Sequence, residues 1–267
     1  MKLHLVPARA GIEWVRLGLR TFWRQPLAFI SLFFSLMALI SIVSQLPLVG
    51  SFLPFLFVPI LTLGMMVAAS VASNDDTPKP VGPAMFTAAL QALRLRWRPM
   101  LVLGMISALY FAVVVGLSAL IDGGLVAGAY LLNSNVLPEV VASKRFQLAQ
   151  LFVMCLNLPL SLAMWHAPGL VHWHGVEPVK SLFFSLVALF RNFRAHAMFL
   201  LSWFGVCMVA AISFALIATL LVGIGALALG DAASVLGGAL MIGCALSLAA
   251  MPLSSTWFSF RDSFNAD

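Results

Sequence analysis

Three histidines near the middle of the chain have the side chains best suited to chemistry. Residues 165–175 read WHAPGLVHWHG, and imidazole nitrogens bind transition metals and haem iron. His166 and His172 are nearly two helical turns apart and could share a helix face, but Pro168 between them would disturb it. No carboxylate or thiol follows at ligand spacing, so His166, His172 and His174 are weak metal candidates and we expect no cofactor.

His166 is the most interesting of the three because it falls inside an apolar stretch. Polar groups in such stretches are functional candidates by default. A membrane enzyme, or a metal- or haem-binding protein that uses these histidines, is therefore one alternative that the sequence leaves open.

A second polar group accompanies the basic segments after residue 175. Its members are Glu177, Lys180, Arg191, Asn192, Arg194, Arg261 and Asp262. The adjacent Arg261 and Asp262 could cap or clamp the helix expected before residue 195. Ion pairs of this kind are more often structural than catalytic. The chain also contains no GxSxG, HExxH or P-loop motif, so we expect no catalytic residues and no enzyme.

The elements that position these residues are six long apolar stretches. Hydrophobic residues make up 62% of the 267 positions and charged residues 9%, a balance that a soluble domain of this length could not bury. No stretch contains Asp, Glu, Lys or Arg, and each reaches the length of about twenty residues that crosses a bilayer. We expect a single all-α polytopic membrane domain over residues 1–267. The expected spans are Leu27–Leu46, Phe52–Ala72, Met100–Ile121, Ala149–Val171, Met198–Leu221 and Ser234–Phe258.

The fifteen Lys and Arg residues are distributed unevenly between the spans. Thirteen lie in the N-terminal segment, the second and fourth loops and the C-terminal tail, two lie in the third loop, and none lies in the first or fifth. The positive-inside rule then predicts a multi-pass protein of the bacterial inner membrane with both termini in the cytoplasm. Although the isoelectric point is near 9.8, the basic residues adjoin spans, so we expect lipid headgroups and not nucleic acid as their partner.

Each odd-numbered span follows a segment with the periodicity of an amphipathic helix. In the first segment Arg9, Glu13, Arg16, Arg20 and Arg24 form a polar stripe beside an apolar one that includes Ile12, Val15, Leu19 and Phe22. Basic amphipathic helices lie in the plane of the membrane interface, so we expect these faces to engage anionic lipid or a membrane-protein partner. The candidate residues are Arg16, Arg20, Arg24, Arg94, Arg98, Lys180, Arg191, Arg194 and Arg261.

The spans are predicted to form three hairpins, each preceded by one of these interfacial helices. Residues 23–26 (WRQP), 97–99 (WRP) and 193–195 (FRA) each lead into a span, and every even-numbered span carries a late proline. These similarities favour three repeated units of parallel topology. Any chain of three hairpins that obeys the charge rule would nevertheless look much the same.

A transporter or permease-like component is the main functional alternative. Pro54 and Pro59 in the second span, with Pro159 and Pro168 in the fourth, could break two helices and open a pathway between them. Ordinary proline kinks are the simpler interpretation, and no span carries an acidic residue to hold an ion or a proton.

Several stretches of the chain resemble an uncharacterised family of proteobacterial inner-membrane proteins. They are residues 165–175, KSLFFS at 180–185, FRNF at 190–193, LPLVG at 46–50 and SFRD at 259–262. The resemblance extends over nearly the whole chain and implies six spans and an inner-membrane location, but no activity. It also implies an aromatic residue where this chain has His166 and a small or aliphatic one where it has His172. The three-hairpin plan is more distantly similar to the membrane domain attached to some glycerophosphodiester phosphodiesterases, a likeness that carries no catalysis.

Overall fold

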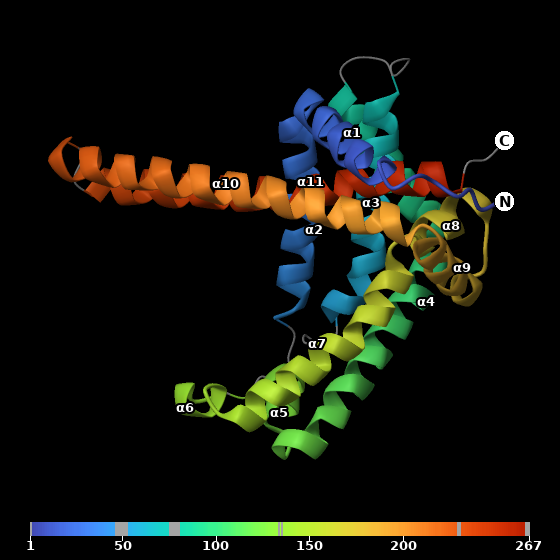
Figure 1. Cartoon of the computed structure of the whole chain (residues 1–267), viewed down its shortest axis with the longest axis horizontal. Coiled ribbons are helices and arrows are strands. Elements are labelled where there is room, and N and C mark those ends of the chain that lie inside the picture. The colour runs from blue at the N-terminus through green and yellow to red at the C-terminus, as the bar shows by residue number, and fades with distance from the viewer. Residues whose placement is uncertain are drawn as a thin grey trace. The chain divides into compact units, whose positions relative to one another are not determined.

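The computed structural model describes residues 2–45, 53–74, 81–132, 134, 136–228 and 231–264, and all regular structure in those ranges is helical (Figure 1). The all-α prediction is therefore confirmed. In chain order the helices are α1 (Ala10–Arg24), α2 (Pro26–Val43), α3 (Leu53–Ser73), α4 (Val81–Asp122), α5 (Leu125–Leu131), α6 (Pro138–Val141), α7 (Lys144–Met164), α8 (Ala167–His174), α9 (Pro178–Arg191), α10 (Phe193–Ala228) and α11 (Asp231–Ser263).

Six helical segments in the described part of the chain are long and apolar enough to cross a membrane, as predicted. They are Pro26–Val43, Pro54–Ser73, Gly82–Asp122, Lys144–His174, Phe193–Leu220 and Met241–Ser263. Each overlaps one expected span. The expected limits at Leu46 and Phe52 lie outside the described residues.

The chain forms two compact units. The first contains Met1–Phe34, Met65–Phe86 and Phe190–Asp267, and the second contains Ser35–Gly64 and Thr87–Leu189. The limits between them fall inside α2, α3, α4 and α9. Because neither unit is continuous in sequence, each depends on residues that are far apart along the chain.

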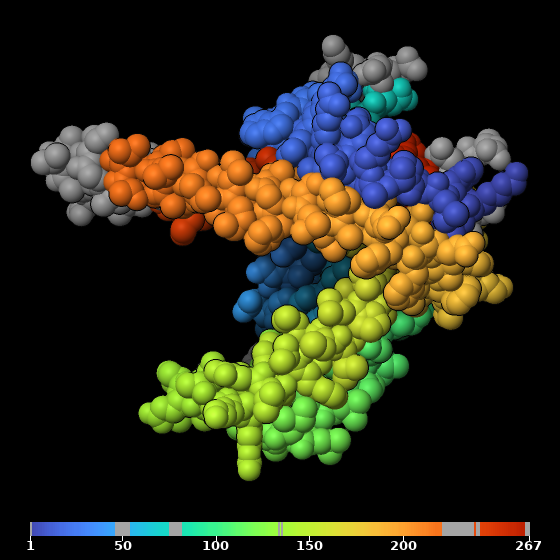
Figure 2. Space-filling view, in the orientation of Figure 1, coloured from blue at the N-terminus to red at the C-terminus, as the bar shows by residue number. Residues whose placement is uncertain are grey.

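In the first unit, α1 packs on both long helices of the C-terminal third, α10 and α11 (Figures 1 and 2). Two glycines make this close approach possible. A Cβ atom at Gly11 would meet the backbone of Ala195 and Phe199 in α10, and one at Gly18 would meet Ser255 in α11. Small residues let helices approach each other closely where lipid surrounds them.

In the second unit, the far end of α4 packs with α5 and the start of α7. Phe111, Val114 and Val115 of α4 form a buried cluster with Val126 of α5 and Phe146, Ala149 and Val153 of α7. The carboxylate of Asp122 accepts hydrogen bonds from the backbone N–H groups of Gly124 (2.8 Å) and Val126 (2.7 Å) and so fixes the turn between α4 and α5. The short helix α5 is thus packed on its own unit.

The three amphipathic segments have different forms. The first and third are separate helices, α1 and α9, each followed at once by a span. The second is the N-terminal part of α4, and only the non-helical backbone at Arg96 (φ −115°, ψ 17°) separates it from the span. Pro99 lies three residues further on, and a proline disfavours helical backbone in the residues that precede it.

Candidate functional site

The face that α1 buries is centred differently from the predicted apolar stripe. The buried residues are Gly11, Trp14, Val15, Gly18, Thr21 and Phe22. Val15 and Phe22 belong to the predicted stripe, whereas Ile12 is 48% exposed. The difference arises because α1 contacts two helices, which together cover a broader face. That face includes glycines, and a search for apolar side chains at helical spacing does not count glycine.

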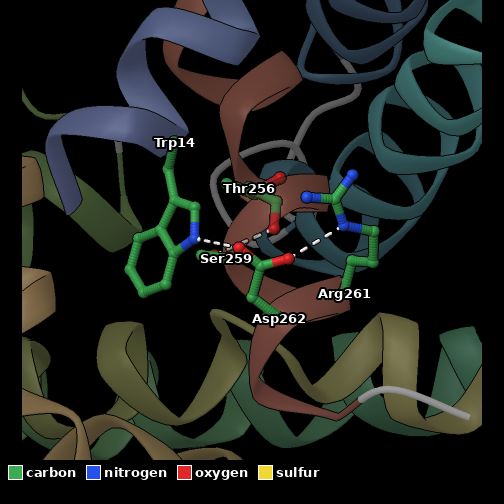
Figure 3. A network of polar contacts seen from close by, with 5 residues as sticks. All are labelled: Trp14, Thr256, Ser259, Arg261 and Asp262. Atoms are coloured by element: carbon green, nitrogen blue, oxygen red, sulfur yellow. Dashed lines mark hydrogen bonds and ion pairs between the residues drawn. The ribbon is translucent and has the colours of Figure 1, made fainter. Parts of the chain in front are cut away.

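Trp14 anchors α1 through a polar contact inside this face. Its side chain is fully buried, and its indole N–H donates to a carboxylate oxygen of Asp262 in α11 at 2.8 Å. The other oxygen of that carboxylate accepts from Nε of Arg261 at 2.9 Å, so the two donors hold Asp262 from opposite sides (Figure 3). One turn earlier, the Ser259 hydroxyl donates to the carbonyl of Thr256 at 2.9 Å. Arg261 and Asp262 were expected as a possible cap or clamp of the helix before residue 195, and these hydrogen bonds join Asp262 to α1.

Asn192, between α9 and α10, fixes the N-terminal segment. Its side-chain carbonyl accepts the N–H of Val6 at 3.0 Å, and its side-chain NH₂ donates to the carbonyl of His4 at 3.0 Å. The His4 N–H donates to the carbonyl of Ser263 at 3.0 Å. Asn192 is 2% exposed, so these bonds are protected from water. The chain before α1 is thereby fixed to the same helices as α1 itself.

The opposite face of α1 carries its arginines. Arg9, Arg16, Arg20 and Arg24 are all exposed. Arg16 lies 3.7 Å from Glu13, but both side chains are largely exposed, and such pairs contribute little to stability. The buried face thus holds the helix in place while the arginine side chains on the opposite face remain exposed.

The other candidate basic residues lie on several helices. Arg94 and Arg98 of α4 are exposed, and the guanidinium of Arg98 lies 5.3 Å from the ring centroid of Trp97. Lys180 of α9 forms an exposed ion pair with Glu177 at 2.9 Å. Arg191 and Arg194 are exposed on either side of Asn192, whereas Arg261 is partly buried beside Asp262. Of the predicted polar group, Asp262 therefore anchors α1 and Asn192 anchors the segment before it. Glu177 and Lys180 pair with each other.

The fourth span is interrupted at Trp165 and His166, between α7 and α8. Pro168 follows in the first turn of α8 and cannot donate a backbone hydrogen bond to the preceding turn. The buried hydroxyl of Ser185 in α9 fills the gap, because it accepts the His166 N–H at 3.0 Å and donates to the Leu162 carbonyl at 3.3 Å. The sequence favoured a proline kink here, and the structure shows a two-residue interruption closed by a side chain from the next helix. The second span has no such interruption, since α3 continues through Pro59.

The histidines do not form a ligand set with other residues that the structure describes. No group of three or more His, Cys, Asp or Glu side chains that could hold a metal ion occurs there. His166 is fully buried at the interruption of the fourth span, whereas His172 and His174 are partly buried in the last turn of α8.

Two residues of the second unit were missed in the sequence. Arg96, at the irregular backbone of α4, donates from Nη2 to the carbonyl of His172 at 3.4 Å and so contacts the end of α8. Ser185 carries no sequence signal, because a serine in a helix face is unremarkable until the interrupted backbone beside it is known. The WRP sequence around Pro99 was the available sign of irregular backbone near Arg96.

Comparison with known proteins identifies one informative relative. Over 195 residues the chain is 35% identical to a probable inner membrane protein of Burkholderia thailandensis, an alignment that covers 72% of this chain and 71% of the relative. No family model matches the chain, and no solved structure matches it. The relative's name gives a location and assigns no activity.

Proposed function

The chain belongs to the same family of inner-membrane proteins as the Burkholderia relative. We propose that it is a non-enzymatic integral membrane protein whose basic helix faces engage anionic lipid headgroups. The observation that carries the proposal is the division of α1 into two faces. One face is fixed on α10 and α11 by Gly11, Trp14 and Gly18, and the other presents exposed arginines.

A helix fixed in this way is a better lipid-binding surface than a free amphipathic segment. A free segment must lose conformational entropy when it becomes ordered on the membrane, whereas α1 is already ordered by its packing. Each Lys or Arg close to an anionic leaflet contributes about 1 kcal/mol of attraction. Arg16 and Arg20 together would contribute about 2 kcal/mol by the same measure.

The predicted orientation gives these arginines a suitable partner. The positive-inside pattern predicts that α1 lies on the cytoplasmic side, where the leaflet carries anionic lipid. Only Gln25 separates α1 from α2, so the basic face of α1 would lie near the depth where that span meets the headgroups.

The test uses the full-length protein in detergent with added phosphatidylglycerol or phosphatidylcholine. We expect phosphatidylglycerol to raise the melting temperature more than phosphatidylcholine does, and Arg16→Gln/Arg20→Gln to lose most of that difference. The matched control is Lys144→Gln/Arg145→Gln, which removes two exposed charges from the opposite predicted side. The control should keep the wild-type response, and salt at about 1 M should abolish it by screening.

An equal response to phosphatidylglycerol in wild type and the α1 variant would overturn the assignment of this face to lipid. A loss shared equally by the α1 variant and the control would show only that net charge matters, which also contradicts a site on α1.

A further inference from the structure

A pocket lies where α9 meets α10. It has a volume of about 430 Å³, and its lining comes from two distant parts of the first unit, residues 6–8 and residues 190–194. Arg191 and Arg194 are both part of the lining, and both are exposed. The lining residues include no acidic side chain, so the pocket is positively charged.

One wall of this pocket is held in place by hydrogen bonds. Val6, Pro7 and Ala8 form the wall, and Asn192 bonds to the backbone of Val6 and of His4 at 3.0 Å each. The carbonyls of Pro7 and Ala8 accept the N–H groups of Ala10 and Gly11 at 2.9 and 3.2 Å, which joins the wall to α1. The pocket is therefore formed before any ligand arrives, and binding does not have to order its wall.

The pocket adjoins the start of an apolar segment of spanning length, where lipid headgroups are expected. The apolar segment that begins at Phe193 is long enough to cross a membrane, so the pocket lies at the end of a span. Phe190 and Phe193 border it and are 69% and 65% exposed. Exposed aromatic side chains next to arginines suit the boundary between headgroups and acyl chains.

We propose that this pocket binds the phosphate group of an anionic glycerophospholipid, with the guanidinium groups of Arg191 and Arg194 as its ligands. Guanidinium groups form strong charge-assisted hydrogen bonds with phosphate oxygens, and a second arginine within three residues supplies donors for further oxygens. Phe190 and Phe193 then lie beside the glycerol and the first part of the acyl chains. The inference deepens the proposed function, since it adds one defined lipid site to the general attraction of α1.

The experiment is a lipid titration of the full-length protein in detergent, followed by native mass spectrometry. Wild type, Arg191→Gln/Arg194→Gln, Asn192→Ala and Ala8→Trp are titrated with phosphatidylglycerol, phosphatidylcholine and inorganic phosphate. We expect wild type to bind one phosphatidylglycerol before all others, and the double arginine variant to bind that first lipid about ten- to thirtyfold more weakly.

The two remaining variants separate a pocket from general surface charge. Asn192→Ala loosens the wall and Ala8→Trp fills the pocket, and neither removes a charge. Both should weaken the binding of the first phosphatidylglycerol. Lys144→Gln/Arg145→Gln, which removes two charges elsewhere, should bind it as wild type does. If Asn192→Ala melts below the titration temperature, Ala8→Trp alone carries this comparison.

Three results would overturn the inference. In the first, Arg191→Gln/Arg194→Gln binds the first phosphatidylglycerol as tightly as wild type does. In the second, the control Lys144→Gln/Arg145→Gln weakens that binding as much as the double arginine variant does. In the third, inorganic phosphate binds as tightly as the lipid. The α1 variant Arg16→Gln/Arg20→Gln distinguishes this failure from that of the proposed function. If only the α1 variant loses phosphatidylglycerol binding, the proposed function stands without this site. If only the Arg191/Arg194 variant loses phosphatidylglycerol binding, the site stands without a role for α1.

Discussion

The indole N–H of Trp14 donates to the carboxylate of Asp262 at 2.8 Å, across 248 positions of sequence. This bond joins the first helix of the chain to the last. Because Arg261 holds the other carboxylate oxygen at 2.9 Å, the carboxylate is fixed by two donors and orients α1 about its own axis. The arginines of α1 are exposed on the face opposite this contact.

Removal of the Trp14 donor should loosen α1. Trp14→Phe deletes the N–H and also shortens a fully buried ring, so we expect a loss of about 2–4 kcal/mol from the lost hydrogen bond and the small cavity together. The measurement is the melting temperature of the purified protein followed by intrinsic fluorescence. Trp23→Phe, in the same helix but 65% exposed, is the matched control and should melt as wild type does. Equal shifts in both variants would argue against the Trp14–Asp262 bond.

The close approach of α1 to α10 should not tolerate a methyl group. Gly11→Ala would gain up to about 1 kcal/mol of helix propensity, but its Cβ would overlap the backbone of Ala195 and force the helices apart at a cost of about 1–3 kcal/mol. We therefore expect a net loss of stability. Gly205→Ala is the control, because a Cβ there meets no atom within 4 Å. A Gly11→Ala protein that melts at or above the wild-type temperature would contradict the packing described for α1.

Ser185 should protect the interruption in the fourth span. Ser185→Ala removes the hydroxyl that accepts the buried His166 N–H, at a cost of about 1–3 kcal/mol, while the Leu162 carbonyl still accepts the N–H of Trp165. Hydrogen exchange followed by mass spectrometry should show faster exchange in peptides that contain residue 166. Ser161→Ala removes a hydroxyl that bonds only to the carbonyl of Asn157 in its own helix and should leave exchange unchanged. Unaltered protection in Ser185→Ala would mean that other groups hold the turn.

The predicted orientation can be tested by cysteine labelling. With Cys155, Cys207 and Cys244 replaced by serine, Ala142→Cys should react with a membrane-impermeant maleimide added to intact cells from which the outer-membrane barrier has been removed. Lys180→Cys, on the polar face of α9, should react only after the inner membrane is opened. Both positions are exposed in the structure, so accessibility should depend on side and not on burial. The reverse pattern would place the termini outside the cytoplasm.

Hydrophobic periodicity and charge were sufficient to predict the class of fold. Six charge-free stretches of spanning length form helices long and apolar enough to cross a membrane, because a helix bonds its own backbone groups and so leaves none unsatisfied in lipid. The same reasoning could not predict how α1 packs. Its burial depends on Gly11 and Gly18, which contribute through absent side chains and add nothing to an apolar stripe.

The anchoring residues were partly visible in the sequence, but their partners were not. Asn192 and Asp262 stood out as polar residues next to spans, yet nothing local indicates that Asn192 bonds to residues 4 and 6 or that Asp262 bonds to Trp14. Such pairings depend on which helices pack together, and that choice is made by side-chain shape over the whole unit. Pro168 did indicate irregular backbone in the fourth span. Ser185, whose hydroxyl accepts the His166 backbone N–H there, lies in a later helix and could not be linked to it from the sequence.

The long sequence separation between α1 and its partners also sets an order of events during synthesis. The segment that contains α1 can dock only after residues 195–262 have been synthesised, and at about 5–20 residues per second the delay is roughly ten to fifty seconds. Throughout that interval the docking surface of this basic, tryptophan-containing helix has not yet been made. Assembly of the first unit therefore follows synthesis of α11, and a chain truncated before the sixth span should have a first helix with no place to bind.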